Sequence, residues 1–359
     1  MSSKDSMTPN ERLAAIREGR PIDRLRCVPV LTNTVARVTG MKVSELRSNG
    51  KLLADAQIAA YRRFGYDSVR VLTDLYVQPE AMGSKIRVPL DETAHLDRPA
   101  ISSENEIDRL RPHDPRKDGV LPELLEALWR TRDAIGGEVP VTCGVEGPFT
   151  LASLIIGAET LSRWTVRNPK AAHRLLEIAF ESCRLLAEAI LDGDGALSIT
   201  DAMTSSTVIS PRHAREFSFQ YLKRLVDYVR SRGKTVSLHI CGKTAPIWKD
   251  MADTGAACLS IDNMASLVDA KALVGDQVCL MGNVQPSEVL LQGTPEDVRR
   301  AVRQCVAEAW DNPKGFIIAS GCSLPTETPF ANIDAMLDAA REIGWPVDPS
   351  TLSDKASAR

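Results

Sequence analysis

The chain has 359 residues, a formal net charge of -3 and a pI near 6.0. Its basic residues are dispersed, without a basic run interleaved with aromatic residues, so the composition argues against nucleic-acid binding. No apolar run approaches the roughly 18 residues of a membrane span, and the polar start of the chain has no secretory signal. Eight cysteines without such a signal therefore predict reduced thiols and a cytoplasmic protein.

Helical and strand signals alternate along most of the chain. A capping box with proline at the first helical position, Thr8-Pro9-Asn10-Glu11, predicts a helix that ends near Glu18. Short apolar, β-branched segments predict strands at 27–31, 68–72, 139–145, 196–200, 235–240, 257–261, 278–281 and 316–319. Apolar residues at helical spacing predict helices at 51–64, 122–134, 149–191 (as several stretches), 211–230, 245–252, 267–273, 295–309 and 333–343. Residues 76–118 are rich in proline, glycine and charge, and predict a long excursion over one end of the fold.

Eight strands that alternate with helices predict a closed parallel (β/α)8 TIM barrel. We expect a helical extension at 1–20, a single barrel domain at 21–346 and a flexible tail at 347–359. The alternative α/β architecture is a doubly wound open sheet. It is disfavoured because no glycine-rich dinucleotide fingerprint follows the first strand and no phosphate loop is present.

Two predicted strands end in residues that bind zinc well. His239 and Cys241 are alternate residues, so in an extended chain their side chains point the same way. Cys322 follows the eighth predicted strand. In a barrel, the C-terminal ends of all strands surround one mouth, so the three side chains could meet around one ion. One imidazole and two thiolates would leave the fourth tetrahedral position open, as catalytic zinc sites do.

The other cysteines and histidines have simpler interpretations. Free cysteine is most often a packing residue, and we assign that role to Cys27, Cys183, Cys258, Cys279 and Cys305. Cys143, late in the third strand, could be packing or could close a purely structural zinc site as its fourth ligand. Solvated surface positions are expected for His95, His113, His173 and His213.

Nearly the whole chain, from about Arg12 to Gly344, resembles the uroporphyrinogen decarboxylase superfamily. Within it, the chain is similar to the zinc-dependent corrinoid methyltransferases of the methylcobalamin:coenzyme M type. The stretches that carry the resemblance are Leu72–Gly83, Val145–Thr150, Leu238–Gly242, Leu280–Val284 and Ser320–Cys322. The resemblance implies a barrel in which His239, Cys241 and Cys322 hold Zn2+.

The resemblance also implies a reaction. A methyl group would move, in either direction, between a corrinoid such as methylcobalamin and a thiol such as coenzyme M or another small methylated molecule. The chain has no corrinoid-binding Asp-X-His-X-X-Gly sequence, so the cobalamin would arrive free or on a separate corrinoid protein.

Four further residues at predicted strand ends are candidates for the site. Asp74 matches the aspartate that grips pyrrole NH groups in the decarboxylase branch, and we predict that it positions substrate. Glu146 and Asp262 are candidates to support the metal ligands or to act as a resting fourth ligand. Asn283 could position substrate or cofactor, or serve the turn before Val284.

Decarboxylation of a tetrapyrrole is the alternative activity, and a barrel with a purely structural zinc is the non-enzymatic one. The decarboxylase branch has an arginine-rich glycine motif where this chain reads Thr32 to Arg37, so the motif is missing. The branch's active-site tyrosine falls on Leu154 and its histidine on Cys322. Three departures against the retained Asp74 favour methyl transfer over decarboxylation.

Overall fold

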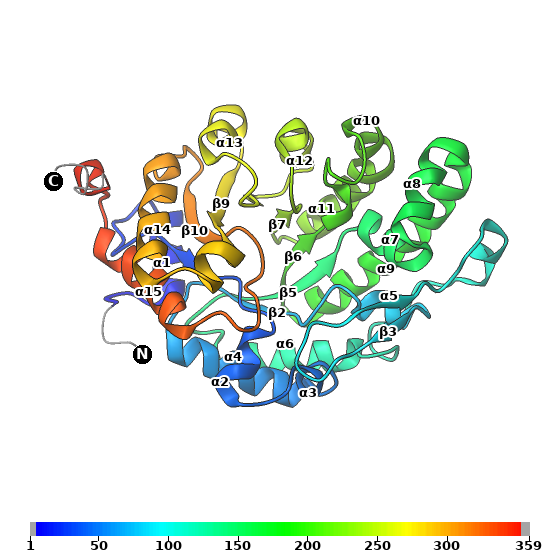
Figure 1. Cartoon of the computed structure of the whole chain (residues 1–359), viewed down its shortest axis with the longest axis horizontal. Coiled ribbons are helices and arrows are strands. Elements are labelled where there is room, and N and C mark those ends of the chain that lie inside the picture. Colours follow the sequence, from blue (N-terminus) through cyan, green and yellow to red (C-terminus); the bar gives the residue numbers. More distant parts are fainter. Residues whose placement is uncertain (1–4, 353–359) are drawn as a thin grey trace.

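A computed structural model describes residues 5–352, which fold as a (β/α)8 barrel and confirm the predicted architecture. Eight parallel strands form one curled sheet at the centre of the molecule, with helices around it (Figure 1). The strands lie in the order β1-β10-β9-β8-β7-β6-β5-β2. Their bounds are β1 (Cys27–Val28), β2 (Val69–Val71), β5 (Val141–Glu146), β6 (Ala196–Thr200), β7 (Val236–His239), β8 (Cys258–Ser260), β9 (Cys279–Val284) and β10 (Phe316–Ser320). Each of the eight predicted strands overlaps one of these.

Strand β1 is shorter than predicted because its regular pairing with β10 stops at Val28. The next N–H, of Val30, donates instead to the hydroxyl of Ser320 at 3.0 Å. The chain is therefore still held against the end of β10 where the mouth of the barrel begins.

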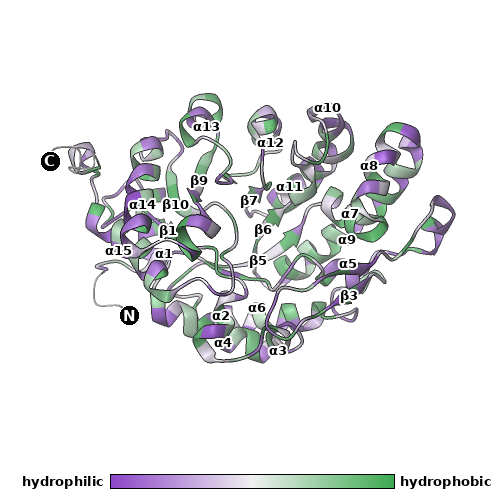
Figure 2. Cartoon of the chain, viewed as in Figure 1, coloured by the Kyte–Doolittle hydropathy of each residue, from purple (hydrophilic) through white to green (hydrophobic). Residues whose placement is uncertain are grey.

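The helices bury apolar faces against the sheet, and hydrophobic residues are concentrated on the central strands (Figure 2). The larger helices are α4 (Gly50–Phe64), α6 (Leu121–Ile135), α7 (Pro148–Ile156), α8 (Ala158–Arg167), α9 (Pro169–Asp192), α11 (Gln220–Ser231), α13 (Leu267–Val274), α14 (Pro295–Ala309) and α15 (Phe330–Ile343). Shorter helical segments are α10 (Pro211–Ala214), η3 (Arg215–Phe219), α12 (Trp248–Asp253), η1 (Glu104–Arg109), η2 (Ala202–Thr204), η4 (Ala245–Ile247), η5 (Pro286–Leu291) and η6 (Pro349–Thr351). Every predicted helix matches one or more of these.

Some short elements were not predicted. Besides η1, η2, η5 and η6, they are α2 (Thr34–Thr39), α3 (Val43–Arg47), α5 (Val77–Ala81), and an antiparallel pair, β3 (Lys85–Arg87) and β4 (His95–Arg98). The last three lie within the predicted excursion. The β3–β4 pair lacks the apolar run of a core strand because most of its residues are exposed, so its sequence gives little strand signal.

The N-terminal helix α1 (Pro9–Arg17) begins with the predicted capping box. It lies at the end of the barrel where the strands begin. At this end β1 and β2 are joined through Asp67 rather than through a regular ladder. The N–H of Asp67 donates to the carbonyl of Cys27 at 3.0 Å, and its carboxylate accepts the N–H of Cys27 at 2.7 Å. The same carboxylate pairs with the buried guanidinium groups of Arg12 and Arg24. Asp67 therefore closes the seam of the barrel.

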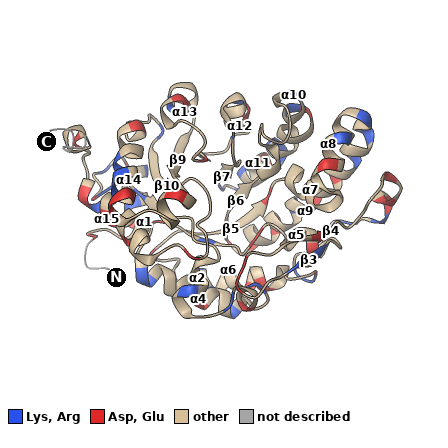
Figure 3. Cartoon of the chain, viewed as in Figure 1, with Lys and Arg blue, Asp and Glu red and all other residues tan. Residues whose placement is uncertain are grey.

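Charged residues of both signs are interspersed over the outer helices (Figure 3). Within residues 5–352, no helix combines the length and apolar character that crossing a membrane requires. The predicted flexible tail begins with η6, and its last part, residues 353–359, lies outside the described residues together with residues 1–4.

Candidate metal centre at the mouth of the barrel

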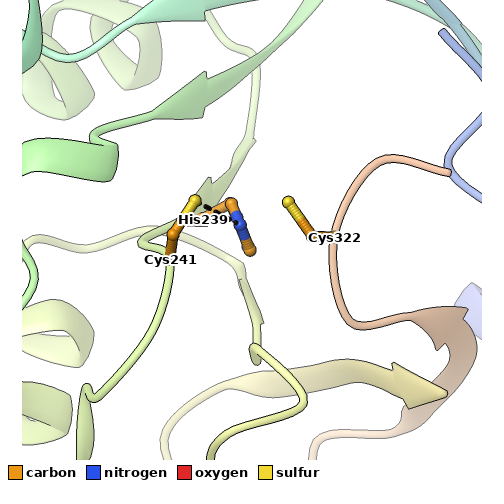
Figure 4. Close-up of side chains that lie close together, drawn as sticks. All are labelled: His239, Cys241 and Cys322. Carbon is orange, nitrogen blue, oxygen red and sulfur yellow. Dashed lines mark hydrogen bonds between the residues drawn. The ribbon is translucent and has the colours of Figure 1, made fainter. Parts of the chain in front are cut away.

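The structure brings His239, Cys241 and Cys322 together. His239 is the last residue of β7, Cys241 follows two residues later, and Cys322 lies in the loop after β10. One nitrogen and two sulfur atoms from these residues lie within 4.8 Å of one another. The Cys241 Sγ lies 3.3 Å from His239 Nε2, and Figure 4 shows the three side chains pointing toward one another. Segments that are 81 residues apart (322 minus 241) thus meet as the sequence predicted.

Ser260 fixes the orientation of His239. The imidazole Nδ1 lies 3.1 Å from the backbone carbonyl oxygen of Ser260 and 3.1 Å from its hydroxyl. A carbonyl can only accept a hydrogen bond, so Nδ1 carries the proton and Nε2 keeps its lone pair for a ligand. Sequence reasoning missed Ser260, although it is the residue that pairs with His239 between β7 and β8. This contact supports a metal ligand, as partners of ligating histidines generally do.

The donor set fits zinc. Zn–S bonds of about 2.3 Å in a tetrahedral site place two sulfurs about 3.8 Å apart. A separation below 4.8 Å between all three ligand atoms allows that geometry with small side-chain rotations. No fourth His, Cys, Asp or Glu joins the group among residues 5–352. Cys143 does not, because it is buried in the hydrophobic core. A closed structural site through Cys143 is therefore not formed.

The two thiols interact strongly with each other when no metal holds them. The pKa of Cys322 is lowered because Cys241 donates a hydrogen bond to its thiolate, and His239 acts in the same direction. The pKa of Cys241 is raised because its proton is held by that hydrogen bond and because the thiol is shielded from solvent. The pair therefore holds one thiolate readily, and a divalent cation would remove the remaining proton.

A cavity of about 870 Å³ runs along the barrel axis. His239, Cys241, Cys322 and Asp74 line it at the C-terminal ends of the strands, which form the mouth of the barrel. Residues of α1 and Lys314 line it at the N-terminal ends of the strands.

Cys258 and Cys279 also line this cavity and are partly exposed, so the prediction that they are packing residues was wrong. Their side chains face the barrel axis, which the spacing of a short strand does not reveal. The packing role of Cys27, Cys183 and Cys305 is confirmed by their burial in the core.

Asp74 lies at the cavity wall in a well-defined hydrogen-bonding environment. Its carboxylate accepts bonds from Arg47 Nε at 2.8 Å, the Thr73 hydroxyl at 3.1 Å and the Tyr76 N–H at 2.8 Å. Arg47 also pairs with Glu80 at 2.7 Å. The Asp74 side chain is 2 % exposed, and it is one of the groups that line the cavity. It is therefore placed to contact a polar part of a bound molecule.

Glu146 is fully buried and does not join the metal-ligand group. One carboxylate oxygen accepts a bond from Gln78 Nε2, and the other has no partner within the described chain. The Gln78 carbonyl in turn lies 2.8 Å from His113 Nε2. Burial raises the pKa of Glu146 to about 7. The surface position expected for His113 was wrong: it is buried in this network, and burial lowers its pKa to about 4.

Replacing Glu146 by glutamine is expected to change the pH dependence of stability. A carboxyl group whose pKa rises from 4.5 to about 7 on folding holds a proton in the folded state that the unfolded chain has released. Stability is therefore lost as pH rises between these values, by on the order of 3 kcal/mol. We expect Glu146→Gln to match the wild type at pH 5 and to exceed its free energy of unfolding at pH 8 by a few kcal/mol, measured with urea.

The control for this experiment is Glu159→Gln, because the side chain of Glu159 is 87 % exposed. Its difference from the wild type should be small and independent of pH. A Glu146→Gln difference that is equally independent of pH would contradict the raised pKa.

Asp262 and Asn283 serve nearby loops in this structure. Asp262 accepts the N–H of Met264 at 2.9 Å and does not join the metal-ligand group. The Asn283 amide donates to the carbonyls of Asp262 and Ala265, at 3.0 and 2.7 Å. Asn283 lies within β9, so the turn before Val284 that was weighed for it is not formed, and its amide holds the loop after β8 instead. Neither residue lines the cavity. Their roles toward a metal or a substrate remain predictions.

Comparisons with known proteins agree with the fold and place the chain in a family. Residues 8–343 match the family described as Uroporphyrinogen decarboxylase (URO-D). The chain is 29 % identical to the methylcobamide:CoM methyltransferase MtaA of Methanosarcina barkeri, over 93 % of this chain and 98 % of that protein. It is 27 % identical to the uroporphyrinogen decarboxylase of Vibrio cholerae, over 85 % and 86 %. A solved methyltransferase structure from Methanosarcina mazei superimposes with a TM-score of 0.85 at 26 % identity, covering 94 % of this chain and 99 % of that one.

Proposed function

The chain belongs to the uroporphyrinogen decarboxylase family, and from that premise we propose that it is a zinc-dependent methyltransferase acting between a corrinoid and a thiol. The observation that carries the proposal is the group His239, Cys241 and Cys322, which lines a large cavity and has no fourth His, Cys, Asp or Glu beside it in the described part of the chain. The similar methyltransferases, named for methylcobamide and CoM, support the same reaction class.

In the proposed mechanism, His239, Cys241 and Cys322 would hold the metal, and a substrate thiol would reach it from the cavity that these residues line. Zinc bound there would lower the pKa of a thiol that coordinates it. The residues around the cavity orient the thiol and exclude water. The thiolate sulfur forms a bond to the methyl carbon of the methyl-corrinoid, while the carbon–cobalt bond breaks and its electron pair stays on cobalt.

The residues that distinguish the family branches favour methyl transfer over decarboxylation. Arg37, the one arginine in the stretch that replaces the arginine-rich motif, donates to the carbonyl of Thr328 at 2.9 Å and does not line the cavity. The cavity wall carries a cysteine, Cys322, at the position of the decarboxylase histidine. The corrinoid would be delivered free or by a separate corrinoid protein.

The test is an assay of the zinc-loaded protein with methylcobalamin and a panel of thiols that includes coenzyme M. We expect loss of the methylcobalamin absorbance together with formation of the methyl thioether, and neither change after zinc is removed by a chelator. X-ray absorption of the zinc should show one additional sulfur ligand when the thiol is bound. Conversion of uroporphyrinogen to coproporphyrinogen, with no reaction of methylcobalamin, would identify a decarboxylase instead.

Replacing Asp74 by asparagine is expected to lower kcat/KM roughly 10- to 100-fold, because misplacement of a bound substrate by about 1 Å has effects of this size. Zinc content should stay stoichiometric, since Asp74 is not one of the three ligands. Glu80→Gln is the matched control: it removes the other carboxylate bound to Arg47 and does not alter the cavity wall. Equal activity of Asp74→Asn and Glu80→Gln would assign Asp74 to the fold alone.

A further inference from the structure

Arg70 is a charged residue in the interior of the barrel that has no carboxylate partner. Its guanidinium lines the central cavity, and none of the ion pairs among residues 5–352 includes it. Nη2 donates to the hydroxyl of Thr200 at 2.7 Å, whereas Nε is buried without any acceptor. The fully buried arginines do have such partners: Arg12 and Arg24 pair with Asp67, and Arg47 pairs with Asp74. Arg26, which lines the opposite end of the cavity, resembles Arg70 in having no carboxylate partner among residues 5–352. A role in holding the fold together therefore does not account for Arg70.

The backbone provides a specific place for this guanidinium. Arg70 lies on β2, and its side chain reaches past β5 to Thr200 on β6. Residue 144 on β5 is a glycine, and a Cβ added there would lie 2.6 Å from Leu72 Cδ2 and 3.1 Å from Arg70 Nη2, so the glycine leaves room for both side chains. Thr200 is the residue that pairs with His239 across β6 and β7. The guanidinium of Arg70 is thus held at the same end of the barrel as His239, next to the strand residue that pairs with it.

The thiolate of Cys322 is the strongest electrostatic partner of Arg70. Burial lowers the pKa of Arg70, and Cys322 opposes this shift most, followed by the buried Cys143 and Glu146 and then by Cys241. No hydrogen bond joins Glu146 to Arg70 within the described chain. The guanidinium and the Cys322 thiolate therefore interact across the end of the cavity that the metal ligands line.

The charge balance of the proposed reaction explains why a cation would be kept there. Zn2+ with two thiolates and a neutral imidazole has no net charge, so binding of a substrate thiolate leaves the centre at -1. In a barrel interior such a charge is unfavourable unless an opposite charge lies nearby. Arg47 is already paired with Asp74 and Glu80, whereas Arg70 is not. We propose that Arg70 is the positioning residue that neutralises the anionic thiolate complex, an inference that rests on the proposed function.

The experiment compares an anionic ligand with a neutral one on the Co2+-substituted protein. Binding of 2-mercaptoethanol is followed at one fixed pH by the sulfur-to-cobalt charge transfer that it adds to that of Cys241 and Cys322, and binding of imidazole by the visible cobalt bands. For Arg70→Met we expect Kd for 2-mercaptoethanol to rise about tenfold, the effect of a neighbouring charge of opposite sign, with Kd for imidazole nearly unchanged. Arg70→Lys should recover part of the thiol affinity.

Two further variants control for changes in folding. Arg26→Met removes another cation of the same cavity, whose Nε is also unpartnered but which neighbours Cys258 and Cys279 at the other end. We expect it to leave both dissociation constants nearly unchanged. Gly144→Ala keeps the arginine but crowds both Leu72 and the Nη2 of Arg70, and should weaken thiol binding more than imidazole binding.

Equal losses of thiol and imidazole affinity in Arg70→Met, or no loss at all, would overturn the role of Arg70 while leaving the proposed function intact. If 2-mercaptoethanol added no sulfur-to-cobalt charge transfer to that of Cys241 and Cys322 in the wild type, the proposed function would be overturned instead, and this inference with it.

Discussion

Replacing Cys322 by alanine is expected to abolish stoichiometric zinc binding while the barrel stays folded. The thiol supplies one of only three protein ligands, and its loss leaves two, so we expect zinc affinity to fall by more than 100-fold, beyond the roughly 10- to 100-fold loss seen when only a supporting residue is removed. The residue lies in the loop after β10 and is partly exposed, so few packing contacts are lost. Metal analysis after gel filtration and the far-UV circular dichroism spectrum measure the two effects. Cys241→Ala should behave in the same way.

Cys143→Ala and Cys305→Ala are the matched controls for this experiment. Both remove a buried thiol, and neither thiol belongs to the metal-ligand group. We expect both variants to retain one zinc per chain, with some loss of stability from the small cavity that each substitution creates. Loss of zinc in Cys143→Ala would restore the closed structural site that was considered from the sequence. Full retention of zinc in both Cys241→Ala and Cys322→Ala would contradict the assigned ligands.

Much of the barrel could be predicted because its signals are local. Strand β6 coincides with its predicted range, and α14 also coincides, since a capping threonine and a proline mark where it begins. The antiparallel pair β3 and β4 was missed because its contacts are between short, exposed segments whose composition is typical of a loop. A core strand is predicted from its run of buried apolar side chains, whereas most side chains of β3 and β4 are exposed.

The metal ligands could be predicted because their residue types are unusual at strand ends, whereas their surroundings depend on three-dimensional neighbours. Ser260 and Arg70 belong to no distinctive motif. The contact of Ser260 with His239 follows from the pairing of β7 with β8. The contact of Arg70 with Thr200 depends on the room that Gly144 leaves between them. His113 was placed at the surface because its sequence neighbours are polar. The structure buries it against Gln78, a contact between residues 35 positions apart.

Replacing Asp67 by alanine is expected to lower the free energy of unfolding by about 3–5 kcal/mol, the usual cost of removing one partner from a buried ion pair. Asp67 is fully buried, and its carboxylate is shared by Arg12, Arg24 and the backbone N–H of Cys27. Alanine would leave two buried guanidinium groups with a reduced set of acceptors. Urea unfolding of the two proteins at pH 7 measures the difference.

Asp334→Ala is the matched control, because Asp334 also forms a close pair with an arginine, Arg63, but both side chains are 36–47 % exposed. An exposed pair of this kind contributes only about 0–1 kcal/mol. The contrast separates the effect of burial from the effect of pairing itself. Asp67 also replaces the regular ladder between β1 and β2, so Asp67→Asn, which keeps an acceptor oxygen for Cys27, should lose less stability than Asp67→Ala. If both variants lost no more than Asp334→Ala, the seam of the barrel would have to be held by the surrounding hydrophobic packing rather than by this carboxylate.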